Sequence, residues 1–490
     1  MKLIQIHPSD NAAVALEDIA RGETLESSSL TALEDIRRGH KIALKDIPAG
    51  GDVVKYGCVI GQAKEDIPAG AWVHVHNVRT GLSEGGSYVY NHKIFPLPDT
   101  APRTFMGFRR PDGRAAVRNE LWIIPTVGCV NAFAQTLARE NQQLVSGSVE
   151  GLCAFSHPFG CSQMGDDHAQ TRKLLAALAR HPNAGGVLVL GLGCENLTME
   201  QFKEELGQWD DRRVKFLICQ ETEDELAAGA ALLEELAEYS GTFRRVEIPA
   251  GELVVGMKCG GSDGFSGITA NPTVGRFSDR LIALGGSTVL TEVPEMFGAE
   301  SILFGRCADE TVFRKAVSMV EDFKRYFISH GQVVYENPSP GNKAGGITTL
   351  EDKSCGCVQK GGRAQIVDVL RYGESVVHKG LNLLCGPGND LVSATALTAA
   401  GAHLILFTTG RGTPFGAPAP TVKISTNTAL FKAKPGWIDF NAGTVAEGET
   451  LDSAGERLLD FVLEIAGGKP AKSEQRGARD ISIWKDGVVL

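Results

Sequence analysis

A five-residue motif, Asp-Ile-x-x-Gly, occurs four times near the start of the chain and constrains the fold more than any other feature. The copies lie in LEDIARGETL, LEDIRRGHKI, LKDIPAGGDV and KEDIPAGAWV. Each copy has the pattern of a short strand, a tight turn that ends in glycine, and a second strand. Four such turns predict a small all-β domain over residues 1–92. We interpret the shared residues as turn formers: Asp18, Asp35, Asp46, Asp66, Gly22, Gly39, Gly50 and Gly70.

The stretch WVHVHNVRT, residues 72–80, places two histidines within this predicted domain. Alternating valines favour a β-strand, in which residues i and i+2 share a face. His74 and His76 would then point the same way, with Asn77 on the opposite face. Two neutral imidazoles can bind a metal ion or a carboxylate-bearing substrate. The alternative is an exposed strand face that is rich in histidine by chance.

The chain has 490 residues, which is long enough for about three domains. The proline-rich residues 93–104 lack hydrophobic periodicity and are predicted to form a linker. Apolar strands and amphipathic helices then alternate, a pattern typical of α/β structure. We predict a middle α/β domain over residues 105–248 and a larger C-terminal α/β domain over residues 249–490.

Composition excludes several classes of function. The net charge of −10 disfavours binding to nucleic acid. There is no apolar run of about 20 residues that would predict a membrane span, and the N-terminus lacks the apolar region of a signal peptide. The 11 cysteines are an odd number and are scattered, so we expect reduced thiols. We therefore expect a cytoplasmic protein that acts on a small molecule.

Cysteines follow several of the predicted strands, where ligands of open α/β sheets bind. Cys161, Cys194 and Cys259 each adjoin a glycine in a predicted loop, and their thiolates suit iron or zinc. Glu292 and Glu295 follow another strand and offer the oxygen ligands that hard cations prefer. These residues are the candidate metal ligands. The signal from spacing is weak, because the sequence has no Cys-x-x-Cys pair and free cysteine is often simply buried.

The stretch CGGSDGFSGITANP, residues 259–272, is dense in glycine and in neutral hydrogen-bonding side chains. Its glycines let backbone amides approach a ligand closely. It matches neither the dinucleotide pattern Gly-x-Gly-x-x-Gly nor a Walker loop, so a polyhydroxylated substrate fits better than a nucleotide. The alternative is an elaborate turn. The candidate substrate-binding residues are Ser262, Asp263, Ser266, Thr269 and Asn271, with Asn342 from a later segment.

Two further segments supply cationic side chains. Residues 337–357 form a predicted polar loop that contains Lys343, and a loop of this length is usually functional or disordered. Arg411, in TTGRGTPFG, suits a substrate carboxylate, although a surface arginine is the simpler alternative. Together with the two histidines they form the candidate catalytic set: His74, His76, Lys343 and Arg411.

Long motifs along the whole chain resemble those of the altronate and galactarate dehydratases. They include HVHN, RNELWIIPTVGCVN, GCSQMGDDH, GLGCEN, CGGSDGFSGITANP, TEVPEMFGAE, NPSPGNKAGGITTLEDKS and GRGTPFG. The resemblance implies an N-terminal SAF (β-clip) domain, a middle domain that forms a homodimer, and a C-terminal Rossmann-like parallel-sheet domain. It also implies dependence on Fe²⁺ or Mn²⁺ under reducing conditions. Several motifs are more similar to the altronate enzymes than to the galactarate enzymes.

The reaction implied by the resemblance is dehydration of D-altronate to 2-dehydro-3-deoxy-D-gluconate. This reaction needs a base for the proton on carbon 2, cations for the enediolate that forms, and an acid for the departing hydroxyl. We predict that the SAF domain closes over the α/β site and brings His74 and His76 to the substrate. Two alternatives remain: the same chemistry on another sugar acid such as galactarate, or a sugar-acid-binding protein without activity.

Overall fold

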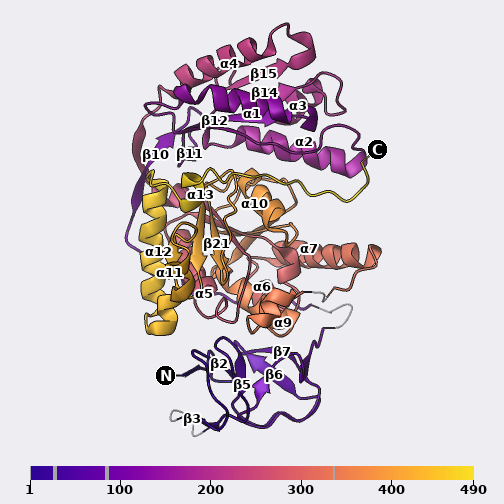
Figure 1. Cartoon of the computed structure of the whole chain (residues 1–490), viewed down its shortest axis with the longest axis vertical. Coiled ribbons are helices and arrows are strands. Elements are labelled where there is room, and N and C mark those ends of the chain that lie inside the picture. The colour runs from indigo at the N-terminus through magenta and orange to yellow at the C-terminus, as the bar shows by residue number, and fades with distance from the viewer. Residues whose placement is uncertain (1, 26–29, 83–87, 335–336, 490) are drawn as a thin grey trace.

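Three structural units are stacked along the long axis of the molecule (Figure 1). The computed structural model describes residues 2–25, 30–82, 88–334 and 337–489. The N-terminal β unit lies at one end and the unit that contains β12 and β14 lies at the other, with the C-terminal unit between them. The prediction of an N-terminal β domain followed by α/β structure with a large parallel sheet is confirmed.

The N-terminal unit consists of short antiparallel strands in three small sheets. Ile42, Val53 and Val73 are fully buried within its two small apolar cores. The strands are β1 (Leu3–Ile4), β2 (Ala12–Ala15), β3 (Thr24–Leu25), β4 (Leu30–Thr31), β5 (Lys41–Ala43), β6 (Asp52–Lys55), β7 (Cys58–Ala63), β8 (Trp72–Val73) and β9 (Val78–Arg79).

The four Asp-Ile-x-x-Gly motifs pair two by two. The Arg38 backbone N–H donates to the Asp18 carboxylate, and the Arg21 N–H donates to the Asp35 carboxylate, both at 2.8 Å. The third and fourth copies exchange the equivalent bonds, Ala69 to Asp46 and Ala49 to Asp66. The closing glycines have φ values from +75° to +87°, which other residues rarely adopt. The motif residues are therefore turn formers, as predicted.

The prediction of one continuous strand over residues 72–80 is wrong. The chain turns between β8 and β9, because the Asn77 side chain accepts from the His74 N–H at 2.9 Å and donates to the Trp72 carbonyl at 2.8 Å. Such local side-chain bonds compete with strand pairing. Both imidazoles still lie against the Trp72 ring, with centroids 5.2 Å and 5.0 Å away. His74 is buried, whereas His76 is exposed.

The unit at the far end has a parallel sheet in the order β13-β12-β14-β15 and a small antiparallel sheet, β11-β10-β16. β12 and β14 are buried along their whole length, as expected for strands covered on both faces. Helices α1 and α4 cover one face, and α2 and α3 cover the other. The elements are β10 (Thr104–Arg109), β11 (Ala115–Ala116), β12 (Glu120–Pro125), α1 (Asn131–Glu140), β13 (Gly151–Ala154), α2 (Gly165–Arg180), β14 (Ala184–Gly191), α3 (Met199–Leu206), β15 (Val214–Ile218), α4 (Glu225–Ser240) and β16 (Arg245–Pro249).

The C-terminal unit is built on a parallel sheet in the order β19-β20-β18-β17-β21-β22-β23. The strands that follow β17 lie first on one side of it and then, from β21, on the other, and ligands bind beyond the carboxyl ends of strands at such a point. The strands are β17 (Val254–Cys259), β18 (Ser287–Leu290), β19 (Ile366–Leu370), β20 (Leu381–Leu384), β21 (Leu404–Thr409), β22 (Thr421–Ser425) and β23 (Phe440–Asn441). The helices are α5 (Ala270–Ala283), α6 (Glu300–Phe304), α7 (Glu310–Ser329), α8 (Pro340–Ala344), α9 (Leu350–Cys357), α10 (Asp390–Ala399), α11 (Thr428–Ala433), α12 (Leu451–Ala466) and α13 (Lys472–Gln475). None of the helices in the described ranges is long and apolar enough to cross a membrane.

The prediction of a polar loop over residues 337–357 is wrong, because the segment contains α8 and α9. Ser339 and Thr349 cap the two helices, each accepting a hydrogen bond from a backbone N–H in the first turn. Every residue of α9 is buried. The helix packs against β7 of the N-terminal unit and against the 3₁₀ turns Val293–Glu295 and Val358–Gly361 of the C-terminal unit, so its polar residues are enclosed by protein.

Candidate functional site

Three buried side chains at the carboxyl end of the C-terminal sheet form a thiol–carboxylate centre, which consists of Cys259, Glu295 and Cys357. The Cys259 sulfur lies 2.9 Å from Glu295 Oε2 and 3.5 Å from the Cys357 sulfur. The Cys357 sulfur lies 3.1 Å from the same carboxylate oxygen. All three potential ligand atoms lie within 4.8 Å of one another.

Neighbouring parts of the fold position these residues. Cys259 is the last residue of β17, and Glu295 lies in the 3₁₀ turn Val293–Glu295 that follows the adjacent strand β18. Cys357 is the last residue of α9. Glu292, with φ of +70°, adopts a left-handed conformation that is costly for a residue with a side chain, and such strain is concentrated at functional sites. In this conformation its carboxylate accepts from the Cys259 N–H at 2.9 Å.

Three buried lysines surround the thiol–carboxylate centre. Lys360 Nζ lies 3.1 Å from the Cys259 sulfur, and Lys353 Nζ lies 2.7 Å from Glu295 Oε1. Lys258 Nζ lies 3.0 Å from Glu292 Oε1 and 2.6 Å from Asp390 Oδ1. Charges buried in this way are tolerated only when they are paired, so the lysines and the acidic groups stabilise each other.

The electrostatics of the centre favour a charged Glu295 beside a protonated thiol. Burial opposes ionisation of Glu295, but the ammonium groups of Lys353 and Lys360 lower its pKa to about 2. Contact with the Cys259 sulfur, together with burial, raises the pKa of Cys357 well above its usual value. Burial raises the pKa of Glu292, and Lys258 partly offsets this effect. A metal cation that displaced the Cys357 proton would have three ligands within reach: the sulfurs of Cys259 and Cys357 and the Glu295 carboxylate.

The donor set fits a divalent transition metal. Thiolates are soft ligands that select iron or zinc, whereas manganese prefers oxygen donors. Of the predicted metal ligands, the structure brings Cys259, Glu292 and Glu295 together. Cys161 and Cys194 lie in loops of the other parallel sheet, after β13 and β14, and are not part of this centre.

The predicted substrate-binding residues are largely occupied by hydrogen bonds within the protein. Asp263 accepts from Ser266 and from Thr426 Oγ1, and its oxygens hold the glycine-rich loop against the following segments. Thr269 donates to the Thr426 carbonyl, and Asn271 donates to the Gly356 carbonyl. The Asn342 side chain donates to the Ser262 carbonyl at 2.8 Å, which joins α8 to the loop. These bonds shape the loop, and contact with substrate remains a prediction.

Arg411 lies near this loop and beside α8, the helix that contains Lys343. Arg411 is exposed and Lys343 is half-buried. A Cβ atom built on Gly341 of α8 would lie 3.3 Å from the Arg411 guanidinium, so α8 and the Arg411 loop are in contact. The Arg411 guanidinium is thus accessible to solvent beside the polar glycine-rich loop.

The N-terminal unit docks on the amino end of α9 through a buried ion cluster. Lys41 Nζ and Lys55 Nζ lie 2.8 Å and 3.1 Å from the two oxygens of Asp352. Burial opposes ionisation of this carboxyl, but the two ammonium groups hold the pKa of Asp352 well below its usual range. The strands of the SAF-like unit are therefore joined to the helix that ends at Cys357.

His74 belongs to this junction. Its Nδ1 lies 3.3 Å from Thr348 Oγ1, just before α9. Burial and the nearby Lys41 lower the pKa of His74 to about 3, so the ring is neutral at neutral pH. Cys357 is at the opposite end of α9, on the order of 10 Å further along the helix. In this structure His74 contacts the C-terminal unit but not the thiol–carboxylate centre.

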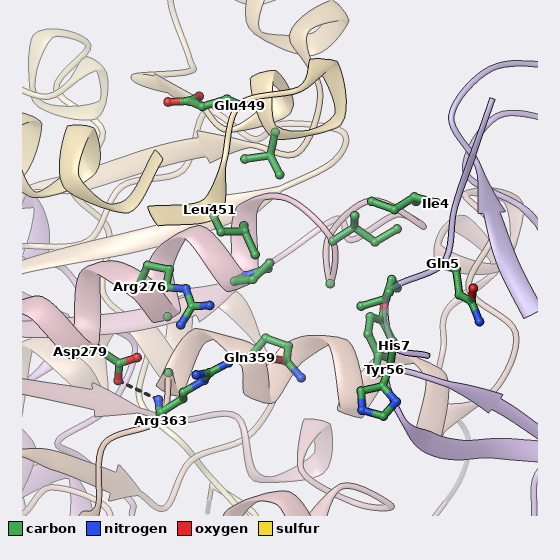
Figure 2. Close-up of a pocket in the computed structure, with 17 residues that line it drawn as sticks. Ile4, Gln5, His7, Tyr56, Arg276, Asp279, Gln359, Arg363, Glu449 and Leu451 are labelled. Atoms are coloured by element: carbon green, nitrogen blue, oxygen red, sulfur yellow. Dashed lines mark hydrogen bonds between the residues drawn. The ribbon is translucent and has the colours of Figure 1, made fainter. Parts of the chain in front are cut away.

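A separate cavity of about 570 Å³ lies where the N-terminal unit meets α5 (Figure 2). His7 and Tyr56 line it from the N-terminal unit, and Arg276 and Gln359 line it from the C-terminal unit. No predicted site residue is among the described residues that line this cavity. It therefore offers no support for the predicted substrate contacts.

The sequence-based predictions missed Cys357 and the three lysines. Cys357 is distant from Cys259 in the chain, and no local pattern joins them. A signal for α9 was present, since Thr349 followed by Asp352 is a typical helix start. That helix carries Lys353 and Cys357 on successive turns toward the centre.

Comparison with known proteins places the chain in one family along its whole length. Residues 1–81 match the altronate/galactarate dehydratase SAF domain, residues 107–240 match the second domain of D-galactarate dehydratase/altronate hydrolase, and residues 250–489 match the D-galactarate/altronate dehydratase C-terminal domain. Altronate dehydratase of Bacillus subtilis is 54% identical over 99% of both chains. Altronate dehydratase of Escherichia coli is 52% identical over 100% of both, and its galactarate dehydratase (L-threo-forming) is 34% identical over 95% of this chain and 93% of its own. The chain therefore belongs to the D-galactarate/altronate dehydratase family.

Proposed function

We propose that this chain dehydrates D-altronate to 2-dehydro-3-deoxy-D-gluconate and water. The identity of 54% and 52% to two altronate dehydratases, against 34% to a galactarate dehydratase, supports altronate as the substrate. The observation that carries the chemistry is the buried thiol–carboxylate centre with its three lysines. A protein that only bound a sugar acid would not need this concentration of paired charge.

The reaction demands stabilisation of negative charge. Removal of the proton on carbon 2, next to the carboxylate, produces an enediolate with two negative charges. Fixed cations in a site that excludes water stabilise such charge strongly. Lys258, Lys353 and Lys360 are held in place by carboxylates and sulfur, so they are already oriented when the charge develops. Their ammonium groups can also donate a proton to the hydroxyl that leaves carbon 3.

We propose that Cys259, Glu295 and Cys357 hold the divalent metal that this family resemblance implies. The two sulfurs favour Fe²⁺ over Mn²⁺. When bound, the ion would add a further positive charge for the enediolate. Exposure of the two thiols to oxygen would explain a requirement for a reductant.

Arg411 and Lys343 are proposed to hold the substrate carboxylate, because Arg411 is exposed beside the glycine-rich loop and lies next to α8, which contains Lys343. The buried centre requires an opening for the substrate. We propose that the SAF domain moves on α9 to provide it, with His74 at the moving contact. We also propose that the middle domain forms a homodimer and that the C-terminal sheet binds ligand in the Rossmann-like manner.

The test is formation of 2-keto acid from D-altronate, galactarate and D-mannonate under anaerobic conditions, with Fe²⁺ or Mn²⁺ and a reductant. We expect altronate to be the best substrate and Fe²⁺ the better ion. Turnover of galactarate equal to or greater than that of altronate would overturn the assignment.

A pair of variants on one helix tests the centre. Cys357→Ala is expected to lose bound iron and at least about 10²-fold in turnover. Cys355→Ala is the matched control, since Cys355 is also buried on α9 but contacts the Gly298 carbonyl and not the centre. Equal iron content and equal turnover in the two variants would show that Cys357 is only a packing residue.

A further inference from the structure

Three cysteines outside the thiol–carboxylate centre gather at the carboxyl edge of the middle sheet, and we call them the three-cysteine edge. Cys129 follows β12, Cys161 follows β13, and Cys194 follows β14. These strands are adjacent and parallel, in the order β13-β12-β14. Because the carboxyl ends of parallel strands meet at one edge of a sheet, the three loops lie side by side.

Hydrogen bonds hold these loops together close to each cysteine. The Gly128 N–H donates to the Phe159 carbonyl at 2.9 Å, which joins the first loop to the second. The Leu197 N–H donates to the Gly160 carbonyl at 3.0 Å, and the Ser162 N–H donates to Asn196 Oδ1 at 2.6 Å. Each cysteine is thus within three residues of a bond between loops, so the backbone at the three cysteines is held in one arrangement.

The cysteines of this edge are not ordinary core residues. Cys129 and Cys194 are exposed, and Cys161 is only partly buried. Free cysteine is usually buried, and exposed thiols are open to oxidation, so two in one small region call for a function. Helices α1 and α2 begin at Asn131 and Gly165, shortly after Cys129 and Cys161.

A buried amide beside Cys161 indicates a missing ligand. Gln163 is 3% exposed, and its Oε1 accepts from the Gly160 N–H at 3.3 Å. Its Nε2 has no hydrogen-bond partner among the described residues. An unpartnered buried donor is costly, so the Gln163 amide is available to donate to a ligand at this edge. Ser162, next to Cys161, has φ of +56°, a conformation that non-glycine residues adopt at functional sites.

We propose that Cys129, Cys161 and Cys194 bind an iron–sulfur cluster. Their three sulfurs do not converge as the donors for one ion must, since Cys259, Glu295 and Cys357 are the described residues whose ligand atoms lie within 4.8 Å. A cluster spans wider separations, because bridging sulfides complete the coordination of each iron. Soft thiolates on three rigid loops suit it, and the Gln163 amide can donate to a cluster sulfur.

This cluster would be distinct from the proposed catalytic metal. The three-cysteine edge belongs to the unit at one end of the molecule, whereas α9, the helix that ends at Cys357, lies near the N-terminal unit at the opposite end (Figure 1). Three protein thiolates leave one iron of a four-iron cluster open to a small ligand. The proposal stands on this geometry and does not depend on the identity of the sugar acid.

Anaerobic reconstitution of the full chain with Fe²⁺ and sulfide tests the proposal. We expect broad visible absorption and on the order of four irons and four acid-labile sulfides per chain, beyond the iron of the catalytic centre. Cys129→Ser, Cys161→Ser and Cys194→Ser should each lose most of this absorption and sulfide. Cys259→Ser and the β13 variant Cys153→Ser are controls that should retain both.

Iron X-ray absorption of the unmutated protein provides a measurement that does not depend on whether the variants fold. A cluster gives sulfur ligands and a short iron–iron distance. Absence of sulfide and of the iron–iron distance would overturn the proposal, as would unchanged absorption in all three serine variants. Zinc in place of iron and sulfide after expression and reconstitution would overturn it as well.

Discussion

Replacement of Asp352 by asparagine is the most informative perturbation of the junction between the SAF domain and α9. The carboxylate pairs with Lys41 and Lys55, and the side chains of all three residues are at most 2% exposed. The change leaves two buried ammonium groups without a counter-charge. Breaking a buried pair in this way costs about 3–5 kcal/mol. Because 1.4 kcal/mol is a factor of ten, docking of the SAF domain should weaken by about 10²- to 4 × 10³-fold.

Hydrogen exchange of α9 and limited proteolysis between the domains measure this docking. We expect faster exchange in α9 and earlier release of an N-terminal fragment in Asp352→Asn. Glu310→Gln is the control, because its partner Arg314 and Glu310 itself are 75% and 64% exposed, and such pairs contribute at most about 1 kcal/mol. If the docking free energy of Asp352→Asn changed by less than about 1 kcal/mol, the buried ion cluster would not be what joins the domains.

The pH dependence gives a second check on the same residue. The folded pKa of Asp352 is depressed, so its contribution is fully present above the unfolded pKa of about 4 and is lost as the pH falls through the folded value. The difference in stability between the parent and Asp352→Asn should therefore shrink as the pH falls below about 4, because the Asp352 carboxylate of the parent then becomes protonated. A difference that shrank from pH 7 downward would contradict the assignment.

Three further predictions concern the predicted site. His74→Ala should lower turnover by about 10²-fold with a modest change in melting temperature. If turnover were unchanged, the only role of the His74 ring would be to pack against Trp72. Gly264→Ala should cost at least about 2 kcal/mol of stability in denaturant unfolding, because its Cβ would lie 1.9 Å from the Gly39 carbonyl, whereas Gly388→Ala has open space. Arg411→Lys should raise KM for altronate at constant melting temperature, since the side chain is exposed and lysine lacks the bidentate geometry; an unchanged KM would place Arg411 outside the substrate site.

The parts of the site that could be predicted are those that depend on neighbouring strand ends. Cys259 ends β17 and Glu295 follows β18, and these strands are paired in parallel. Their proximity follows from the general rule that the carboxyl ends of parallel strands meet. The turn-forming role of the repeated aspartates was equally local, since each motif contains its own signal.

The parts that could not be predicted depend on contacts between distant segments. Cys357 meets Cys259 across 98 residues, and Lys41 meets Asp352 across 311. Nothing in the local pattern of α9 indicates which surface will cover it. The prediction of a strand over residues 72–80 failed for the opposite reason. The alternating valines favoured a strand, but the Asn77 side chain forms local hydrogen bonds with the backbone of His74 and Trp72.

The exchange of hydrogen bonds between paired Asp-Ile-x-x-Gly motifs limits how the SAF domain can vary. The Asp18 carboxylate accepts a hydrogen bond from the Arg38 N–H, and the Asp35 carboxylate accepts one from the Arg21 N–H. Each turn therefore depends on the other for a hydrogen bond. Loss of a single copy would leave one aspartate and one backbone donor without partners. A change that removes the aspartate of one motif should therefore destabilise the turn of its paired motif as well as its own.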